Sequence, residues 1–325
     1  MRLAELTAAG NEASDLLRVH DEKVLETLGA RSAYWTVLDE GPVERCLALL
    51  VESADGRWTA RPVEADAGDQ AGRTEDAEAL AWHDGWVYVF GSHFGSKRGP
   101  LRPKRAFMAR FRESLTPRLD IVKHRFALHR AVNDAVAAIV EPPADAVRDS
   151  FVTATLRRGH AKGKKWTGQL QLADHPINVE AAAFTSAGTL LIGLRWPVSA
   201  FGEPLLVEAG LRWRESVDVI GVHRLRGAGQ GPLGVRALSA RADESFDVIV
   251  GSIDALDKDS VLLDNHPEAR DVTCKHYRFT LGGGPPELIA DLAPLHHVEG
   301  VSEWNGRPLY VTDEAHQIAL YTRAP

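Results

Sequence analysis

A repeated motif, in which a glutamate opens two apolar runs, constrains this chain more than any other feature. The motif occupies residues 76–93, 178–195 and 297–313. In each copy a glutamate lies thirteen positions before the end of the second run, as from Glu78 to Gly91. Two short strands joined by a tight turn fit that spacing, so the motif predicts a β-hairpin. A hairpin that recurs at a long period indicates an array of small sheets.

Further strand-like segments follow these hairpins and divide the chain into five units. The expected units are 11–65, 76–123, 176–228, 234–290 and 297–325. Four antiparallel strands fit in each unit except the last, which has room for three. In the fourth unit the outer strands are expected at 261–263 and 276–281. Repeated small sheets cover one another around a common axis, so we predict an all-β propeller with five blades; six blades is the alternative.

The N-terminus offers the strand that the last unit lacks. Residues 1–10 contain one strand-like segment, at positions 2–6. A ring closes without a free sheet edge if this segment pairs with the last unit. We therefore predict that the N-terminal strand completes the fifth blade.

The interval 124–175 interrupts the repeat. Residues 129–140 carry apolar side chains at helical spacing, and the segment Glu141-Pro-Pro ends that pattern. We predict a helix there, packed over one rim of the propeller or along an outer edge. The basic, glycine-containing segment 157–165 is expected to be an exposed loop. The interval is thus predicted to be a helical insertion between the second and third blades.

Composition excludes several classes of protein. The chain has 325 residues, 44% hydrophobic and 26% charged, with a formal net charge of -7. This negative charge argues against a general nucleic-acid binder. Two cysteines form neither a disulfide framework nor a cysteine zinc site, so a reducing cytoplasm is expected. We expect neither a signal peptide nor a membrane span, because no sufficiently long apolar run occurs.

Propeller geometry predicts a polar ring at one end of the central channel. The innermost strand of each blade begins at that end, and the second strand returns to it. Trp82 and Trp196 are expected to line the same rim. The polar residues assigned to the ring by this register are Glu78, Glu180, Glu299, Asn178, Asp15, Asp39, His93, Arg195, Arg236, His297 and Asp313.

These residue types suggest chemistry. Carboxylate and amide oxygens suit Ca²⁺ or Mg²⁺, histidines can act as general bases, and arginines can bind a carboxylate or phosphate. The candidate metal ligands are Glu78, Glu180, Glu299 and Asn178. The candidate catalytic residues are His93, His297, Arg195, Arg236 and Asp313. In the structural alternative, the repeated glutamates bond neighbouring backbone amides and lock the blades together, and arginines or a cation compensate their charge.

Two classes of function remain open from the residues alone. One is a metal-assisted hydrolase of a small ester, lactone or phosphoester. The other is a non-catalytic propeller that binds a ligand or partner protein on the same rim. We expect a small-molecule or anionic ligand in the channel, no nucleotide cofactor, no nucleic acid and no membrane. The segment 97–112 carries seven basic residues, for which a solvated loop is favoured over a polyanion site.

The motifs resemble those of the bacterial family of unknown function numbered 3616. The most specific match is the segment Ile192-Gly-Leu-Arg-Trp-Pro197, and the resemblance covers nearly the whole chain. It implies a propeller similar to those of the esterase-like phytase, lactonase and strictosidine-synthase kind, and it implies no settled activity. Ala79 and Ala181 stand where that family usually has glycine, which narrows access to the backbone at both positions.

Overall fold

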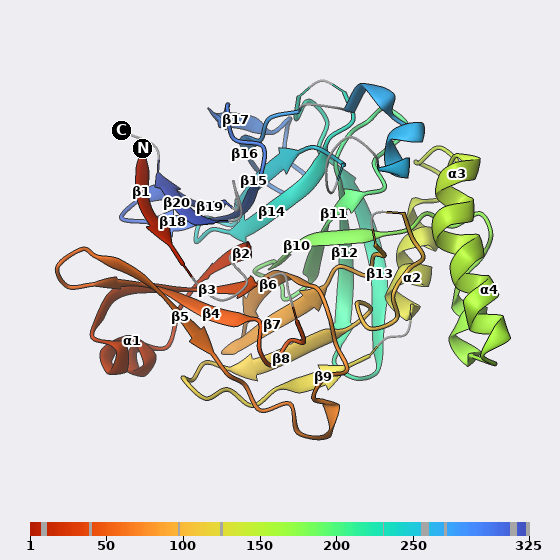
Figure 1. Ribbon diagram of the computed structural model, residues 1–325. Coiled ribbons are helices and arrows are strands. Elements are labelled where there is room, and N and C mark those ends of the chain that lie inside the picture. The colour runs from red at the N-terminus through yellow and green to blue at the C-terminus, as the bar shows by residue number, and fades with distance from the viewer. Residues whose placement is uncertain are drawn as a thin grey trace.

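The chain folds into five four-stranded antiparallel sheets arranged around a common axis (Figure 1). The prediction of a five-bladed propeller is confirmed. The computed structural model describes residues 1–7, 12–38, 41–96, 98–123, 126–229, 231–254, 260–269, 272–312 and 317–322.

In blades 1 to 4 the strands run from the inside of the blade outward in chain order. Blade 1 contains β2 (Ala13–Arg18), β3 (Ala30–Leu38), β4 (Leu47–Ser53) and β5 (Trp58–Val63), with α1 (Glu22–Leu28) between β2 and β3. Blade 2 contains β6 (Ala77–His83), β7 (Trp86–Gly91), β8 (Met108–Arg112) and β9 (Asp120–Val122). Blade 3 contains β10 (Asn178–Phe184), β11 (Leu190–Trp196), β12 (Leu205–Arg212) and β13 (Ser216–Arg224). Blade 4 contains β14 (Gly234–Ala240), β15 (Phe246–Gly251), β16 (Lys275–Phe279) and β17 (Glu287–Asp291).

Blade 5 joins the two ends of the chain. Its strands are β18 (Val298–Trp304), β19 (Arg307–Thr312), β20 (Ile318–Thr322) and β1 (Arg2–Leu6). The pairing of β1 with β20 is antiparallel, and the amide of Thr322 donates to the carbonyl of Met1 at 2.9 Å. The N-terminal strand therefore completes the last blade, as predicted, and satisfies backbone groups along β20.

The outer part of blade 4 differs from expectation. Residues 261–263, expected as a strand, belong to a short 3₁₀ turn, Val261–Asp264, which begins at Ser260. The amide of Leu262 points to the Ser260 hydroxyl, and Leu262 and Leu263 are buried. An apolar run of three residues fits a buried turn as well as a strand, and here tertiary packing decides. The outer strands are β16 and β17.

The insertion is more helical than expected. It contains α2 (Ala127–Val136), α3 (Asp145–Arg148), a π-helical turn (Asp149–Thr153) and α4 (Ala154–Ala161). The expected helix at 129–140 is α2, which ends earlier. The expectation of a loop at 157–165 is wrong, because α4 continues the preceding turns. Its Arg157 and Arg158 are exposed, while Phe151 and Val152 are buried, so the basic residues form the solvent face of a helix.

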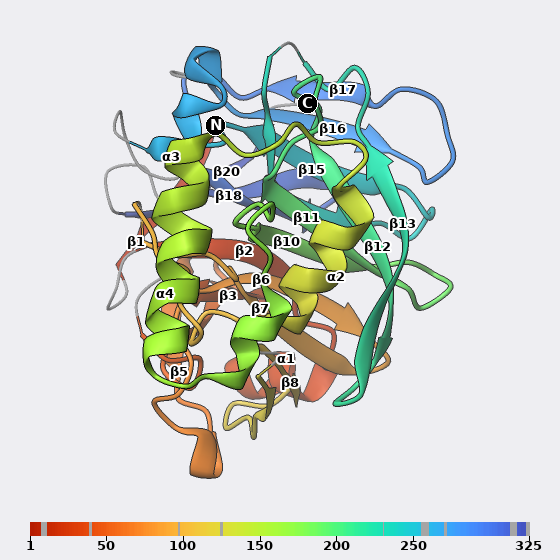
Figure 2. The same ribbon diagram turned by 90° about the vertical axis from the view of Figure 1, so that its right-hand side faces the viewer.

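The insertion covers one end of the propeller. Phe126, Val147 and Phe151 share a buried apolar cluster with loops that follow the second strands of blades 2, 3 and 4. These blades contribute Trp196, at the end of β11, and the loop residues Phe94, Leu101, Val198, Ile253, Leu262 and Leu263 to the cluster. Figure 2 looks onto this end, with α2 and α4 in front of the strands. None of the helices in the described ranges is both long and apolar enough to cross a bilayer.

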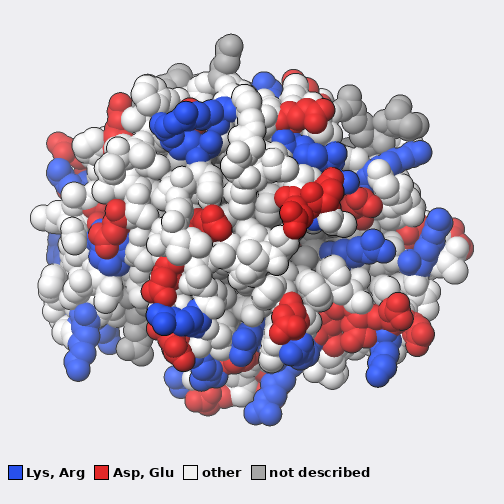
Figure 3. Space-filling view, turned by 180° about the vertical axis from the view of Figure 1, so that it is seen from behind, with Lys and Arg blue, Asp and Glu red and all other residues white. Residues whose placement is uncertain are grey.

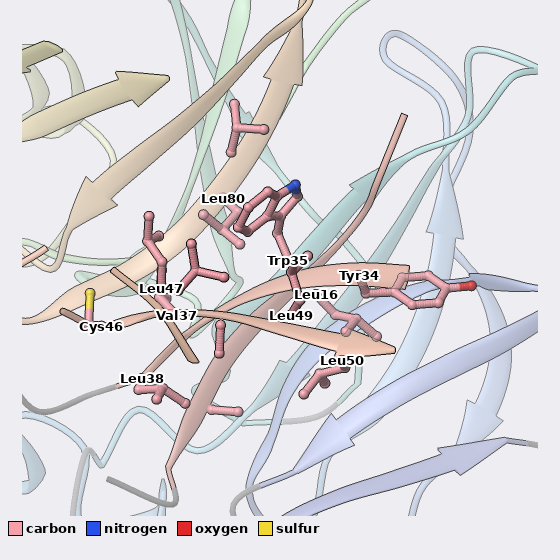
Figure 4. Packing of buried hydrophobic residues seen from close by; sticks show 14 of the residues in the cluster. Leu16, Tyr34, Trp35, Val37, Leu38, Cys46, Leu47, Leu49, Leu50 and Leu80 are labelled. Atoms are coloured by element: carbon pink, nitrogen blue, oxygen red, sulfur yellow. The ribbon is translucent and has the colours of Figure 1, made fainter. Parts of the chain in front are cut away.

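Apolar side chains pack between the blades. Trp35 of blade 1 is fully buried and meets Phe111 of blade 2 edge to face, at 5.1 Å between ring centroids. Figure 4 shows Trp35 among Leu16, Leu47 and Leu80. Cys46 lies in the same cluster, and both cysteines are free and buried. Each blade thus forms part of the core of the next.

Deleting residues 1–10 should expose the edge of β20 and leave its backbone groups without partners. We expect the melting temperature to fall by at least about 5 °C, with aggregation on heating. The measurement is differential scanning calorimetry, with Arg57→Gln in an exposed turn as the control. An unchanged melting temperature of the deletion variant would show that β1 contributes nothing to closure.

Candidate functional site

All five inner strands carry a β-bulge at the same level of the propeller. The register between β6 and β7 shifts at Glu78, and the register between β10 and β11 shifts at Glu180. The equivalent residues in β14 and β18 are Arg236 and Glu299. In β2 the irregularity contains Asp15. A bulge turns a side chain away from its normal direction in the sheet, so each blade presents one charged residue here.

Glu180 is held by its own blade. It accepts hydrogen bonds from the Asn178 amide at 2.7 Å and from the Arg195 guanidinium at 3.2 Å. Arg195 also donates to the carbonyls of Ser252, at 3.2 Å, and Asp254, in the loop after β15. Arg195 therefore satisfies a buried carboxylate and ties blade 3 to blade 4.

Arg236 and Glu299 form an ion pair between blades 4 and 5. The two residues are only 1% and 8% exposed. A buried charge is costly unless a partner of opposite charge lies against it, so each residue compensates the other.

Asp15 joins blade 1 to blade 2. Its carboxylate accepts the amide of Leu16 at 2.7 Å and the amide of Leu80, in β6, at 2.6 Å. Burial raises the pKa of Asp15 to about 7, against the opposing effect of these two hydrogen bonds. At Asp15, therefore, an acidic side chain bonds a backbone amide of the neighbouring blade and joins the two blades, which is the structural role considered as the alternative to ligand binding.

The described residues do not fit a divalent cation at the ring. Guanidinium groups lie against Glu180 and Glu299, where an ion would have to bind, and the amide of Asn178 points its nitrogen at Glu180. Glu78 is half-buried at the equivalent bulge. Within the described ranges, no three His, Cys, Asp or Glu side chains are grouped closely enough to hold a metal.

The other predicted residues have different positions. His93 is fully buried after β7, and its Nδ1 lies 2.8 Å from the carbonyl oxygen of Gly91. His297 is half-buried immediately before β18. Asp39 and Asp313 lie outside the described residues. The expectation for Trp82 is wrong: it lies beside the β6–β7 turn, at the opposite end of the blade, and stacks on His20.

The insertion adds a buried polar group that sequence reasoning missed. Asn133 of α2 donates to the carbonyls of His129, at 3.0 Å, and His175, at 3.1 Å, and accepts the amide of His175 at 2.7 Å. Burial, with the charge of nearby His93, lowers the pKa of His129 to about 3. Burial lowers the pKa of His175 to about 4. Both imidazoles are therefore neutral near pH 7. The four-residue spacing of His129 and Asn133 on one helix face was the available signal.

Four buried polar atoms in this region have no hydrogen-bond partner among the described residues: His129 Nε2, His175 Nδ1, Asn178 Oδ1 and Trp196 Nε1. They belong to one neighbourhood. Asn178 and Trp196 are opposite each other in the β10–β11 pairing, and the His175 and Trp196 rings are 5.8 Å apart. Buried polar atoms in proteins nearly always have partners, so these atoms are expected to bond either ordered water or a ligand.

Hydrogen-bond roles can be assigned to three of the four atoms. Nε2 of His175 lies 2.7 Å from the Glu141 carbonyl and must donate, which makes Nδ1 an acceptor. Nδ1 of His129 lies 3.3 Å from the amide nitrogen of Asn133, whose two N–H groups already donate to the carbonyls of His129 and His175, so this contact assigns no role to Nε2 of His129. Trp196 is a donor and the Asn178 oxygen an acceptor. Among these three atoms the site offers one donor and two acceptors.

An open cavity of about 510 Å³ lies at the same end of blade 2. Asp76, in its wall, binds Arg105 at 2.7 Å, and Glu75 binds Arg102. Burial raises the pKa of Asp76, and the carboxylate of Glu180 acts in the same direction. The remaining lining residues are Gly41, Pro42, Gly72, Thr74 and Lys104.

No protein-family model and no curated protein matches the chain, so the resemblance to the family numbered 3616 stays a prediction. Solved structures are similar in fold. A GH43 β-1,3-galactosidase has 8% identity and a TM-score of 0.48, with 96% of this chain and 90% of that chain covered. The periplasmic gluconolactonase of Pseudomonas aeruginosa has 11% identity and a TM-score of 0.44, with 96% and 81% covered. A luciferin-regenerating enzyme has 9% identity and a TM-score of 0.41, with 96% and 91% covered. Propeller hydrolases thus occur among the structural neighbours, but at such low similarity none of their activities transfers to this chain.

Replacing Arg236 by alanine should leave Glu299 buried and unpaired. We expect a loss of about 3–5 kcal/mol in unfolding free energy, and the double variant Arg236→Met, Glu299→Met should recover most of it. Urea denaturation measures both. As a control, Arg212→Ala breaks an exposed ion pair, in which 66% of the arginine side chain is accessible to solvent. This change should lower the unfolding free energy by less than about 1 kcal/mol. Equal losses for Arg236→Ala and Arg212→Ala would refute the role of the buried pair.

Asp15 should make stability depend on pH. Between the ordinary pKa of 3.8 and the folded value of about 7, the native state holds a proton that the unfolded chain releases. Stability therefore falls as pH rises through this window. The measured quantity is the unfolding free energy of the wild type minus that of Asp15→Asn. This difference should fall by on the order of 2–4 kcal/mol from pH 4 to pH 8. A difference that is constant with pH would show that Asp15 titrates normally.

Proposed function

We propose that the helix-covered end of the propeller binds a small, neutral molecule that carries hydroxyl or carbonyl groups. The observation that carries this proposal is the set of four buried atoms without partners, contributed by His129, His175, Asn178 and Trp196. One donor and two acceptors among these atoms match a hydroxylated ligand, since each hydroxyl donates one hydrogen bond and accepts others. Burying such groups without partners would be costly, and a ligand removes that cost.

The balance of charge favours a neutral ligand over a cation or an anion. The carboxylates of Asp76, Glu180 and Glu299 each lie against an arginine. No excess charge then remains on these pairs to attract an ion. Figure 3 shows the molecule from a different side than the helix-covered end, and there basic and acidic side chains are interspersed. The proposal therefore departs from the anionic ligand and metal that the sequence suggested.

Hydrolysis of a bound ester or lactone is the second candidate. It is favoured by the buried imidazoles that border the site, His93 and His129. An efficient general base has a pKa near the working pH, and His129, with a pKa of about 3, is far from that value. His93 is therefore the residue to which we would assign proton transfer.

Binding can be tested by thermal shift with neutral monosaccharides and lactones, and with the matched sugar acids. We expect a neutral compound to raise the melting temperature by at least about 2 °C, equally with and without EDTA, because ligands stabilise the state they bind. Trp196→Phe should lower the affinity for that ligand about tenfold or more, because it removes one hydrogen-bond donor. Trp82→Phe, at the opposite end of the blade, is the matched control.

Two results would contradict this proposal. One is stabilisation by sugar acids alone, which would require an uncompensated cation in the site. The other is a melting temperature that falls on chelation, which would restore the metal hypothesis. Release of acid from a lactone or ester, abolished in His93→Gln but retained in Trp82→Phe, would advance the second candidate.

A further inference from the structure

A second cavity, of about 730 Å³, lies at the end of blade 2 that is remote from the ring. β7 begins there with Trp86, which pairs with Arg112 at the end of β8. The hairpin between β12 and β13 brings Arg214 of blade 3 to the same place. The remaining lining residues are Ala67, Gly68, Asp69, Gln70, Ser114, Arg118, Leu119, Asp120 and Ile121.

Alternating indole and guanidinium groups form a ladder beside this cavity. The guanidinium of Arg110 lies 4.3 Å from the ring centroid of Trp86 and 4.4 Å from that of Trp213. Arg112 lies 4.3 Å from the Trp86 ring and donates to the carbonyl of Asp84 at 2.7 Å. Each cation–π contact fixes the plane of a guanidinium, so Arg112 is held in place before any ligand arrives.

The lining of the cavity contains three arginines, Arg112, Arg118 and Arg214, and two carboxylates, Asp69 and Asp120. Asp120 is already shared by Arg110, Arg214 and the indole nitrogen of Trp213, which donates to it at 2.6 Å. Arg112 and Arg118 are both exposed. Within the described ranges, neither has a carboxylate partner. Two guanidinium groups therefore remain available in a chain whose net charge is -7.

The cavity also explains part of the basic segment 97–112 that the sequence left without a role. In its loop, Arg102 and Arg105 bind Glu75 and Asp76, so those charges are already neutralised. Arg110 and Arg112 lie on β8 instead and belong to the ladder. The segment is thus neither a solvated loop throughout nor a single polyanion site.

We propose that this cavity binds a small aromatic oxyanion, such as an aryl phosphate. Arg112 and Arg118 would bind the oxyanion through their guanidinium N–H groups, which match phosphate oxygens in geometry and charge. The aromatic ring would stack on the guanidinium of Arg112 and so add one more layer to the ladder. The site is at the opposite end of the blade from the proposed neutral-ligand site, and the two proposals can fail independently.

Isothermal titration calorimetry at constant ionic strength tests this proposal with phenyl phosphate and inorganic phosphate as probes. We expect phenyl phosphate to bind at least about tenfold more tightly than inorganic phosphate, because only phenyl phosphate can stack. Arg118→Gln should lower the affinity for both probes about tenfold or more, since it removes one charge-assisted contact. Arg112→Gln should also remove the preference for phenyl phosphate.

Arg57→Gln is the matched control, because Arg57 lies in a turn of blade 1 with 77% of its side chain exposed. It should bind both probes like the wild type, and circular dichroism should show all three variants folded. Wild-type affinity in folded Arg118→Gln would overturn the oxyanion site, as would the absence of binding by the wild type. Equal affinity for the two probes would overturn the stacking part and the choice of an aromatic ligand.

Discussion

The fold depends on the compensation of buried charge. Five β-bulges turn charged side chains into the interfaces between blades, where each charge needs a partner. A bulge at the same level of every inner strand re-aims one residue. Four of these five residues are acidic, and the fifth is Arg236. Buried charge is tolerated only with a partner. Arg236 neutralises Glu299, Arg195 neutralises Glu180, and Asp15 bonds an amide of the next blade. The contacts that remove the cost of burial also join blades 1 to 2, 3 to 4 and 4 to 5.

That arrangement has consequences for function. Carboxylates that are engaged by arginines are poor ligands for Ca²⁺ or Mg²⁺, because the cation would have to displace a guanidinium. What remains near the covered end is a neutral hydrogen-bonding group, in which His129 and His175 keep low pKa values through burial. The insertion supplies His129 and also covers this end of the propeller. Closing the end and completing the polar site are therefore achieved by the same segment.

The sequence predicts the architecture well because the hairpin repeat is periodic. Five blades, the helical insertion and closure by the N-terminal strand all follow from spacing and strand count. The same register brings Glu180 and Arg236 to one level of the propeller. It does not reveal which side chains pair, because Arg236 and Glu299 are 63 positions apart in sequence and meet only across a blade interface. It also misplaced Trp82, whose blade end depends on strand direction, and it missed Asn133, whose partners come from a loop 42 positions away.

A crystal structure of the protein grown with millimolar CaCl₂ at neutral pH would test the central claim most directly. We predict that Arg236 remains in contact with Glu299 and Arg195 with Glu180, with no ion between the carboxylates. A calcium ion at about 2.3–2.6 Å from Glu180 or Glu299, with the arginines turned away, would contradict this account. It would show that the ring of bulged residues is an ion site, and that the guanidinium groups occupy this site only when the ion is absent.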